Sequence, residues 1–330
     1  MNSLVRTILS SPTRLAMPIL ASPGARLIGC EVREVFTDPV KQFEAQAALH
    51  KRFDTPFVMS AMDLSVEAEE IGSEIRIEGD EVPTVIGRVV HDESEVRALA
   101  IPEVGGRRTR IYLDVIRRLA ELPDHPPVLG GMIGPFSLAG RLFGVSEALL
   151  ATATEPETMT LLVEKVTGFL VQYAAAFKGA GAQGIIIAEP TAGLIAPGSL
   201  AEFSSPYVRR IINEVEDDNF SVILHNCGAR LAHLPSIRKS GAAILHFGRP
   251  MDIIAALESV DSGTVVCGNL DPAEVFCGAT PAGVAASVAG LLEGAVGRKN
   301  FIISSGCDIP AQCTTENLEA FFSTVGERSN

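Results

Sequence analysis

Seven short apolar runs, each bounded by turn residues, constrain the fold more than any other feature of the sequence. The runs lie at 56–62, 126–134, 184–189, 221–227, 242–248, 264–269 and 300–306. Each is apolar almost throughout rather than alternating, which is typical of parallel strands covered on both faces. Segments with helical patterns lie between several of them, including 38–53, 155–181 and 280–295. This order predicts an α/β fold with a parallel sheet.

The number and spacing of the runs favour a closed sheet. With an eighth, weaker strand at 82–90, they predict a (β/α)8 TIM barrel, and a doubly wound sheet is the alternative. The first hundred residues are less regular and should contain extra helices or a hairpin. We expect a single domain over 1–330, in which 1–55 form a helical extension packed on the barrel. A hydrophobic content of 47% is enough for a sizeable core.

Charge and hydropathy exclude several classes of partner. The formal net charge is −13, and no basic stripe stands out, so neither nucleic acid nor an anionic membrane is an expected partner. No apolar run approaches the length of a membrane span. The first twenty residues contain arginines and a proline where a signal peptide has an unbroken apolar region. These features predict a cytoplasmic protein.

Polar side chains follow five successive predicted strands at the point where each strand ends. In a (β/α)8 barrel the chemistry lies at the carboxyl ends of the strands, so these side chains should gather around one mouth. They are Glu189, His225 with Cys227, His246, Asn269 with Asp271, and Cys307 with Asp308.

His225, Cys227 and Cys307 form a set of zinc ligands. Residues two apart on a strand point to the same side, so the imidazole and the first thiol can hold one ion between them. A catalytic zinc ion takes three protein ligands of this kind and keeps a fourth position open. Two thiolates cancel the charge of the ion, so a bound substrate thiolate would give an electron-rich centre suited to alkylation. A lone histidine such as His246 is more often a hydrogen-bonded core residue.

Three motifs in order, ILHNCG (223–228), GNLDP (268–272) and SSGCDIP (304–310), resemble those of the uroporphyrinogen decarboxylase superfamily. Within it they are most similar to the methylcorrinoid:thiol methyltransferases. The segments 63–72, 130–144 and 188–211 extend the resemblance over most of the chain. The resemblance implies a (β/α)8 barrel, in agreement with the strand count.

The resemblance also implies a reaction and its participants. Zinc, held by the residues that match His225, Cys227 and Cys307, would activate an acceptor for the methyl group of a methylcobalamin-type corrinoid. The acceptor is either a thiol such as coenzyme M or tetrahydrofolate. The sequence has no Asp-x-His-x-x-Gly stretch of a cobalamin-binding domain, so the corrinoid is expected on a separate partner protein.

Further site residues follow from the same resemblance. Relatives carry an acidic residue where this chain has Gly248, which leaves His246 and Glu189 as candidates for a fourth zinc ligand. The loop with Asn269 and Asp271 would line the substrate pocket, although both residues could simply cap a helix. From its place next to Cys307, Asp308 could contact substrate, cap a helix or orient a ligand by a hydrogen bond.

Two other functions remain open. A metal-free, uroporphyrinogen decarboxylase-like enzyme would use Asp63, which falls near the aspartate of that family, but the Arg-x-x-Gly-Arg-Tyr motif for substrate propionates is missing. We expect Asp63 and Glu189 to be catalytic residues, with Asp63 as the central carboxylate of the decarboxylase alternative. A non-catalytic member of the fold would bind corrinoid or metal without turnover.

Overall fold

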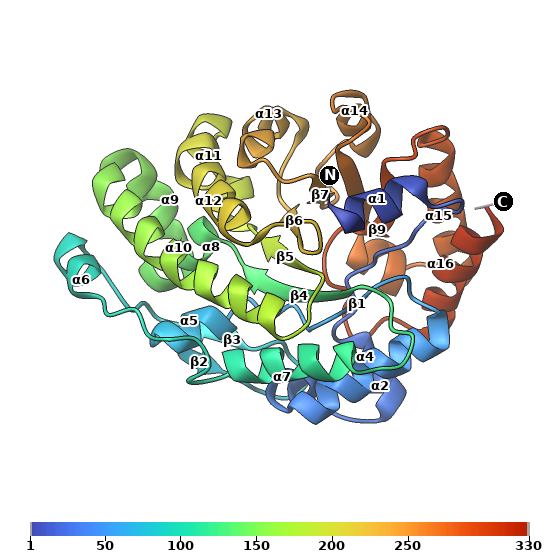
Figure 1. The fold of residues 1–330 in the computed structure, drawn as a ribbon, viewed down its shortest axis with the longest axis horizontal. Coiled ribbons are helices and arrows are strands. Elements are labelled where there is room, and N and C mark those ends of the chain that lie inside the picture. The colour runs from blue at the N-terminus through green and yellow to red at the C-terminus, as the bar shows by residue number, and fades with distance from the viewer. Residues whose placement is uncertain (1, 329–330) are drawn as a thin grey trace.

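A computed structural model describes residues 2–328 and shows a parallel sheet curled into a barrel with helices outside it (Figure 1). The seven strands are hydrogen-bonded in the order β1-β4-β5-β6-β7-β8-β9. They are β1 (Val58–Met59), β4 (Val128–Ile133), β5 (Gly184–Ala188), β6 (Ser221–Asn226), β7 (Ile244–Phe247), β8 (Val265–Leu270) and β9 (Phe301–Ser305). Each of the seven predicted apolar runs forms one of these strands, so the predicted fold class is confirmed.

The predicted eighth barrel strand at 82–90 is wrong. Its only strand segment, β3 (Thr84–Ile86), pairs antiparallel with β2 (Glu74–Arg76) in a separate hairpin outside the barrel sheet. Both strands of this hairpin are partly exposed, so they lack the buried second face that a barrel strand has. The hairpin itself was expected in this region.

An extended N-terminal segment, 15–19, lies beside β9 in the place of an eighth strand. The amide of Met17 donates to the carbonyl of Ile303 at 2.9 Å, and the amide of Ile303 donates to the carbonyl of Leu15 at 3.2 Å. These bonds form a parallel bridge between Ala16 and Ile303. The sheet is therefore extended by a segment whose partner lies almost 290 residues further along the chain.

Helices cover the outer face of the sheet, and the helices predicted at 38–53, 155–181 and 280–295 are present as α4, α10 and α15. Asp38 accepts from the amides of Val40 and Lys41 at the start of α4, and Thr280 accepts from the amide of Gly283 at the start of α15. The α-helices up to the hairpin are α1 (Ser3–Ser10), α2 (Pro23–Ile28), α3 (Val32–Thr37), α4 (Pro39–Phe53) and α5 (Val66–Ile71). Those after it are α6 (Glu93–Ala98), α7 (Thr109–Ala120), α8 (Pro135–Phe143), α9 (Val145–Thr154), α10 (Pro156–Gly179), α11 (Pro197–Phe203), α12 (Ser205–Val215), α13 (Leu234–Ile237), α14 (Ile253–Glu258), α15 (Pro281–Gly294) and α16 (Thr315–Glu327).

Four short helical turns complete the described elements. They follow β5, β6, α13 and β8, so three of the four lie in loops that leave the carboxyl ends of strands. They are η1 (Thr191–Leu194), η2 (Leu231–His233), η3 (Arg238–Ser240) and η4 (Pro272–Cys277). Among residues 2–328, no helix combines the length and apolarity that crossing a membrane requires.

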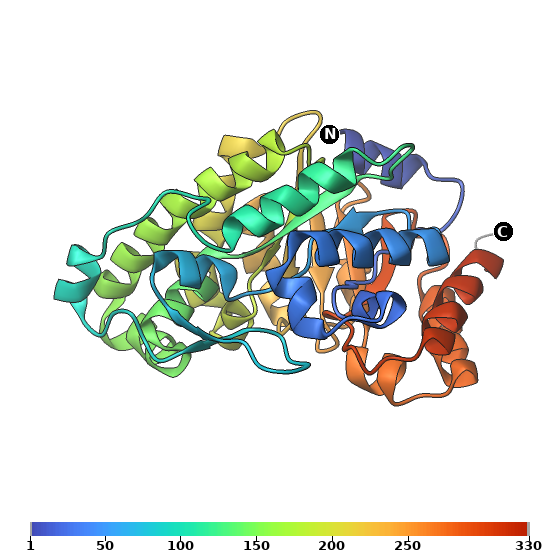
Figure 2. The same ribbon diagram turned by 90° about the horizontal axis from the view of Figure 1, so that it is seen from below.

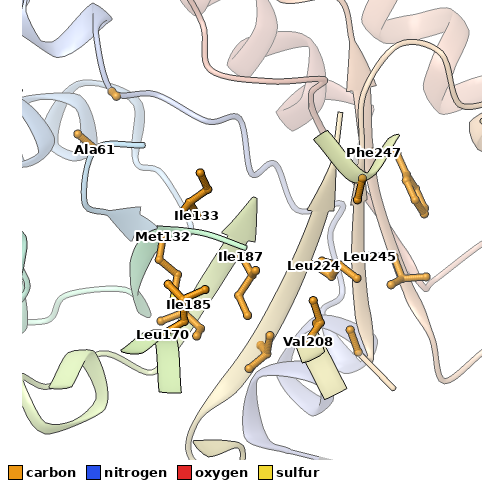
Figure 3. Packing of buried hydrophobic residues seen from close by; sticks show 14 of the residues in the cluster. Ala61, Met132, Ile133, Leu170, Ile185, Ile187, Val208, Leu224, Leu245 and Phe247 are labelled. Carbon is orange, nitrogen blue, oxygen red and sulfur yellow. The ribbon is translucent and has the colours of Figure 1, made fainter. Parts of the chain in front are cut away.

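The strands contribute alternate side chains to two cores. Outward-facing residues pack against the helices, as Figure 3 shows for Ile185 of β5 beside Leu170 of α10. Inward-facing residues form a separate aliphatic layer inside the barrel, which α1 closes at the amino-terminal end of the strands (Figure 2). This layer contains Leu129, Ile186, Ile223, Ile244, Val265 and Ile302. The next inward positions, two residues further along β6, β7 and β9, are His225, His246 and Ser304. The aliphatic layer therefore forms a floor beneath polar residues at the opposite mouth.

Glu67 on α5 is a buried carboxyl group, and only one of its two oxygens accepts a hydrogen bond from another residue. It is 1% exposed, and its Oε1 accepts from the amide of Ile133 at 2.9 Å. Its Oε2 has no hydrogen-bond partner within residues 2–328. Burial raises the pKa of Glu67 to about 8, because removal from water disfavours the charged form.

The raised pKa predicts a pH-dependent stability. Between pH 4.5 and 8 the folded protein keeps a proton on Glu67 that the unfolded chain releases, so this group lowers the free energy of unfolding as pH rises. Glu67→Gln removes this contribution. Between pH 5 and pH 8, the free energy of unfolding of the variant should therefore rise relative to that of wild type by on the order of 1–4 kcal/mol. Urea unfolding at several pH values measures the difference, with the exposed Glu157→Gln as a control for the formal charge. Identical pH profiles for wild type and Glu67→Gln would contradict the assignment.

Candidate metal centre

Three potential metal ligands meet at the carboxyl end of the barrel. His225 is near the end of β6, Cys227 follows that strand, and Cys307 follows β9. One nitrogen and two sulfur atoms of these residues lie within 4.8 Å of one another. Strands β6 and β9 are separated in the sheet by β7 and β8, so the three side chains approach one another across the mouth. The structure brings together all three residues that the sequence predicts as principal zinc ligands.

The two thiols are electrostatically coupled. A hydrogen bond with Cys307 lowers the pKa of Cys227 to about 7, assisted by the backbone amides of Cys227 and Gly228. The same hydrogen bond, together with burial, raises the pKa of Cys307. The pair therefore shares one proton readily, and a cation between the sulfur atoms would replace that proton. Cys227 is half-buried, and Cys307 is the most exposed residue of the three, although its thiol is largely shielded from water.

Gly248 explains how Cys227 reaches its position. A Cβ atom on Gly248 would lie 2.1 Å from the carbonyl oxygen of Cys227, a distance that no side chain can occupy. The backbone after β6 thus passes directly over the end of β7. An acidic side chain could not occupy this position without moving the Cys227 loop.

Hydrogen bonds from His225 through His246 to Ser304 fix the tautomer of the His225 imidazole. The single hydroxyl proton of Ser304 points to a backbone carbonyl, that of Met17 at 2.5 Å or that of Ser305 at 3.0 Å. The Ser304 oxygen must therefore accept the hydrogen bond that joins it to Nε2 of His246, at 2.7 Å.

The protonation of His246 follows. Burial, and then the neighbouring His225 ring, lower the pKa of His246 well below its usual value, so its imidazole is neutral and has one donor and one acceptor nitrogen. Since Nε2 donates to Ser304, Nδ1 of His246 accepts from Nδ1 of His225 at 2.8 Å. The remaining nitrogen of His225, Nε2, is buried and has no hydrogen-bond partner among residues 2–328. In a neutral imidazole whose Nδ1 donates, Nε2 has the lone pair that a metal ligand requires.

His246, which was predicted as a possible fourth metal ligand, has no ring nitrogen free to bind a metal in this arrangement. Both ring nitrogens of His246 are hydrogen-bonded, one to His225 and one to Ser304. The geometry favours a role in orienting His225. Ligation by His246 itself remains a prediction that would need the ring to turn.

The N-terminal segment holds the loop that carries Cys307. The amide of Ile19 donates to Oγ of Ser305 at 2.9 Å, and the amide of Ile309 donates to the carbonyl of Ile19 at 3.0 Å. The amide of Ala21 donates to Asp308 at 2.9 Å. Burial raises the pKa of Asp308 to about 8. Asp308 therefore anchors the loop next to Cys307, and its predicted contact with substrate remains a prediction.

Glu189 lies outside the metal centre with its carboxylate turned toward the start of α8. It is fully buried and accepts from the amides of Phe136 and Ser137 at 2.9 and 3.0 Å, and from the hydroxyl groups of Ser137 and Ser204. A carboxylate at a helix N-terminus is stabilised by the exposed amides. Burial outweighs these bonds and raises the pKa of Glu189 to about 7. Glu189 is not among the groups that meet at the cluster of His225, Cys227 and Cys307, and its predicted catalytic or ligand role remains a prediction.

Asp63 is part of a buried ion-pair network. One oxygen accepts from the amide and the hydroxyl of Ser65, and the other is paired with Arg108 and accepts from Tyr112 at 3.3 Å. Asp63 is 3% exposed and Arg108 is 6% exposed. Asp63 is not among the groups that meet at the cluster of His225, Cys227 and Cys307, and its predicted catalytic role remains a prediction.

Asn269 and Asp271 make the structural contacts that were the alternative to substrate binding. The side-chain amide of Asn269 donates to the carbonyls of Gly248 and Met251 at 2.9 and 2.7 Å. Asp271 accepts from the amides of Ala273 and Glu274 and caps η4. Their predicted role in substrate binding remains a prediction.

Three residues of this region were not predicted from the sequence. Ser304 sets the His225 tautomer, Arg108 neutralises Asp63, and Arg141 at the end of α8 faces a cavity. The only sequence signal for Ser304 was its position two residues beyond the inward-facing Ile302. The two arginines carry no local motif.

Comparisons with known proteins show the family of the chain. The family model for uroporphyrinogen decarboxylase (URO-D) matches residues 5–328. The methylcobamide:CoM methyltransferase MtbA of Methanosarcina acetivorans is 30% identical over 292 residues, which cover 87% of this chain and 84% of that protein. A uroporphyrinogen decarboxylase of Anaeromyxobacter dehalogenans is 29% identical over 301 residues, 89% of this chain and 84% of that protein.

A solved structure shows the same fold. A methyltransferase from Methanosarcina mazei superimposes with a TM-score of 0.89 at 21% sequence identity, covering 99% of this chain and 98% of that one. Fold, family model and sequence identity over most of the chain lead to one conclusion: the chain belongs to the uroporphyrinogen decarboxylase family.

Proposed function

We propose that this protein is a zinc-dependent methyltransferase that transfers a methyl group from a methylated corrinoid, carried by a separate protein, to a small-molecule thiol. The observation that carries the proposal is the cluster of His225, Cys227 and Cys307 with an unpartnered Nε2 on His225. The similarity to a methylcobamide:CoM methyltransferase supports the reaction class.

The donor set fits zinc. Zinc takes imidazole nitrogen and thiolate sulfur in tetrahedral sites, and a catalytic site with three protein ligands keeps a position for substrate. Cys307 is the most exposed residue of the three. When bound, zinc would lower the pKa of an acceptor thiol, so that the thiol is present as thiolate near neutral pH.

The residues around the cluster support alkylation. With Cys227 and Cys307 as thiolates, the protein ligands contribute two negative charges, and the sulfur of an incoming thiolate keeps its nucleophilicity. In the transfer, the new S–C bond forms as the Co–C bond breaks, and the electron pair of the Co–C bond stays on cobalt. The thiol proton is released before the attack. No acidic group is needed to protonate a leaving group.

We favour a thiol such as coenzyme M as the methyl acceptor, and tetrahydrofolate is the alternative acceptor. An N-nucleophile gains little from a thiolate-rich centre, whereas a thiol gains a lowered pKa. The metal-free decarboxylase alternative depends on Asp63, whose two oxygens are already engaged by Ser65, Arg108 and Tyr112. Nothing in that reaction requires the two cysteines.

Removal of one sulfur ligand should abolish metal binding. We expect about one zinc ion per chain in wild type, and almost none in Cys227→Ser or Cys307→Ser, because a hydroxyl group is a much weaker zinc ligand than a thiolate. Elemental mass spectrometry of protein expressed with added zinc measures this. Methyl transfer from methylcobalamin to coenzyme M should fall with the metal, while the circular dichroism spectrum stays unchanged.

Cys30→Ser is the matched control, since Cys30 is similarly half-buried but lies between α2 and α3. It should keep both zinc and activity. Retained zinc and full activity in Cys307→Ser would overturn the assignment. Absence of zinc from wild type would favour the decarboxylase alternative.

The hydrogen-bond chain behind His225 gives a second prediction. His246→Phe keeps the ring volume but removes the acceptor for Nδ1 of His225, so the tautomer and orientation of the ligand are no longer fixed. Zinc affinity should fall about 10- to 100-fold with all three ligands present. Competition with a chromophoric chelator measures this without reference to turnover.

His125→Phe serves as the control, because His125 precedes the amino-terminal end of β4 on the far side of the barrel. Equal zinc affinities for wild type and His246→Phe would mean that packing alone orients His225. That result would contradict a role for the hydrogen bonds through His246.

A further inference from the structure

Three loop backbones meet at Gly248, and two of them carry the paired cysteines. A Cβ atom on Gly248 would lie 2.8 Å from the Cα atom of Cys227, and a Cβ atom on Gly306 would lie 3.2 Å from the Cα atom of Gly248. Cys307 directly follows Gly306. Gly248 therefore lies between the two loops. Because neither glycine has a side chain, the loops can approach closely enough for the two sulfur atoms to meet.

Hydrogen bonds to β8 fix the backbone around this meeting point. The side-chain amide of Asn269 donates to the carbonyl of Gly248 at 2.9 Å, and the amide of Gly306 donates to the carbonyl of Leu270 at 2.6 Å. Asn269 and Leu270 belong to β8, which lies between β7 and β9 in the sheet. The folded sheet therefore sets the spacing of the two thiols.

The remaining gap between the sulfur atoms is small. The Sγ atoms of Cys227 and Cys307 lie within 4.8 Å of each other. A disulfide joins sulfur atoms about 2.05 Å apart, and rotation of a cysteine side chain between staggered positions moves its sulfur by about 3 Å. Side-chain rotation can therefore bring the two sulfur atoms into bonding distance without unfolding either loop.

The other four cysteines do not combine pairing with access to solvent. Cys267 and Cys313 are buried, and Cys30 and Cys277 are half-buried. Cys277 influences Cys313 electrostatically, but the latter is shielded from solvent. Cys307 is the most exposed of the six residues, so a small oxidant from solvent meets it first.

We propose that Cys227 and Cys307 are a reversible modification site, which hydrogen peroxide oxidises to an intramolecular disulfide in the metal-free protein. One sulfur attacks the peroxide, the O–O bond breaks, and a sulfenic acid and water form. The other sulfur attacks the sulfenic sulfur, so that the S–S bond forms as the S–O bond breaks and a second water leaves. The thiols lose two electrons to the peroxide, and their two protons end in the water molecules. A dithiol reverses the reaction by thiol–disulfide exchange.

The disulfide would remove both sulfur donors from the candidate metal centre. A disulfide sulfur has no thiolate charge, so His225 is left as the single ligand of the three, and zinc binding is lost. Disulfide formation itself depends only on the two thiols, whereas its effect on methyl transfer rests on the proposed function. Oxidation and metal binding then exclude each other, and the oxidant level of the surroundings controls methyl transfer.

Thiol counting on the full-length, metal-free protein tests the inference. Chelator-treated wild type is exposed to hydrogen peroxide, unfolded and alkylated with iodoacetamide. We expect two fewer alkylated cysteines than in the reduced protein, and a linked peptide pair that contains Cys227 and Cys307. The intact mass before alkylation should be lower by two hydrogen atoms. Dithiothreitol should restore full alkylation.

The matched variants are Cys307→Ser and Cys277→Ser. The first should form no intramolecular disulfide. The second should form it at the wild-type rate, because Cys277 lies at the end of η4 and outside the pair. Three results with wild type would overturn the inference: full alkylation after peroxide, accumulation of sulfinic acid, or a linkage that does not join Cys227 to Cys307.

Added zinc separates this inference from the proposed function. Since only the metal-free form has two free thiols, zinc at about 100 times its dissociation constant should slow disulfide formation about 100-fold. Disulfide formation that zinc does not slow would contradict the metal centre of the proposed function and leave the modification site intact. Zinc binding and methyl transfer without disulfide formation in the metal-free protein would overturn the modification site alone.

Discussion

The hydrogen-bond chain from the backbone through Ser304 and His246 to His225 is the interaction on which the site depends. The Ser304 hydroxyl donates to a backbone carbonyl, so its oxygen accepts from Nε2 of His246. Because His246 is neutral, its Nδ1 then accepts from Nδ1 of His225. The result is a buried imidazole nitrogen with a free lone pair beside two coupled thiols. His225, His246 and Ser304 thus occupy inward positions on three strands with polar side chains that serve the metal centre instead of the hydrophobic core.

The N-terminal segment extends the sheet beside β9 and supports the site. The segment 15–19 lies beside β9, where its carbonyl at Met17 accepts from Ser304, and the following residues hold the Cys307 loop through Ser305 and Asp308. Formation of the site therefore requires pairing between residues almost 290 positions apart.

The sequence predicted the parts of the structure that depend on local pattern. Continuous apolar runs identified seven strands, and period two together with strand ends identified His225, Cys227 and Cys307. The eighth position was misassigned, because the segment 15–19 is short, contains Pro18 and acquires its partner only through the closed fold. The direction of a carboxylate is likewise a tertiary property: Glu189 follows a strand as expected, yet its oxygens turn to the amides of α8. Arg141 has no local signal, and its place in a cavity wall follows only from the tertiary structure.

The coordination of zinc in the purified protein tests the central claim most directly. X-ray absorption at the zinc edge distinguishes sulfur from nitrogen and oxygen ligands by distance, about 2.3 Å against about 2.0 Å. We predict two sulfur ligands and one imidazole nitrogen, with the fourth position taken by water. A third sulfur ligand should appear when an acceptor thiol is added. A spectrum without sulfur ligands would contradict the account.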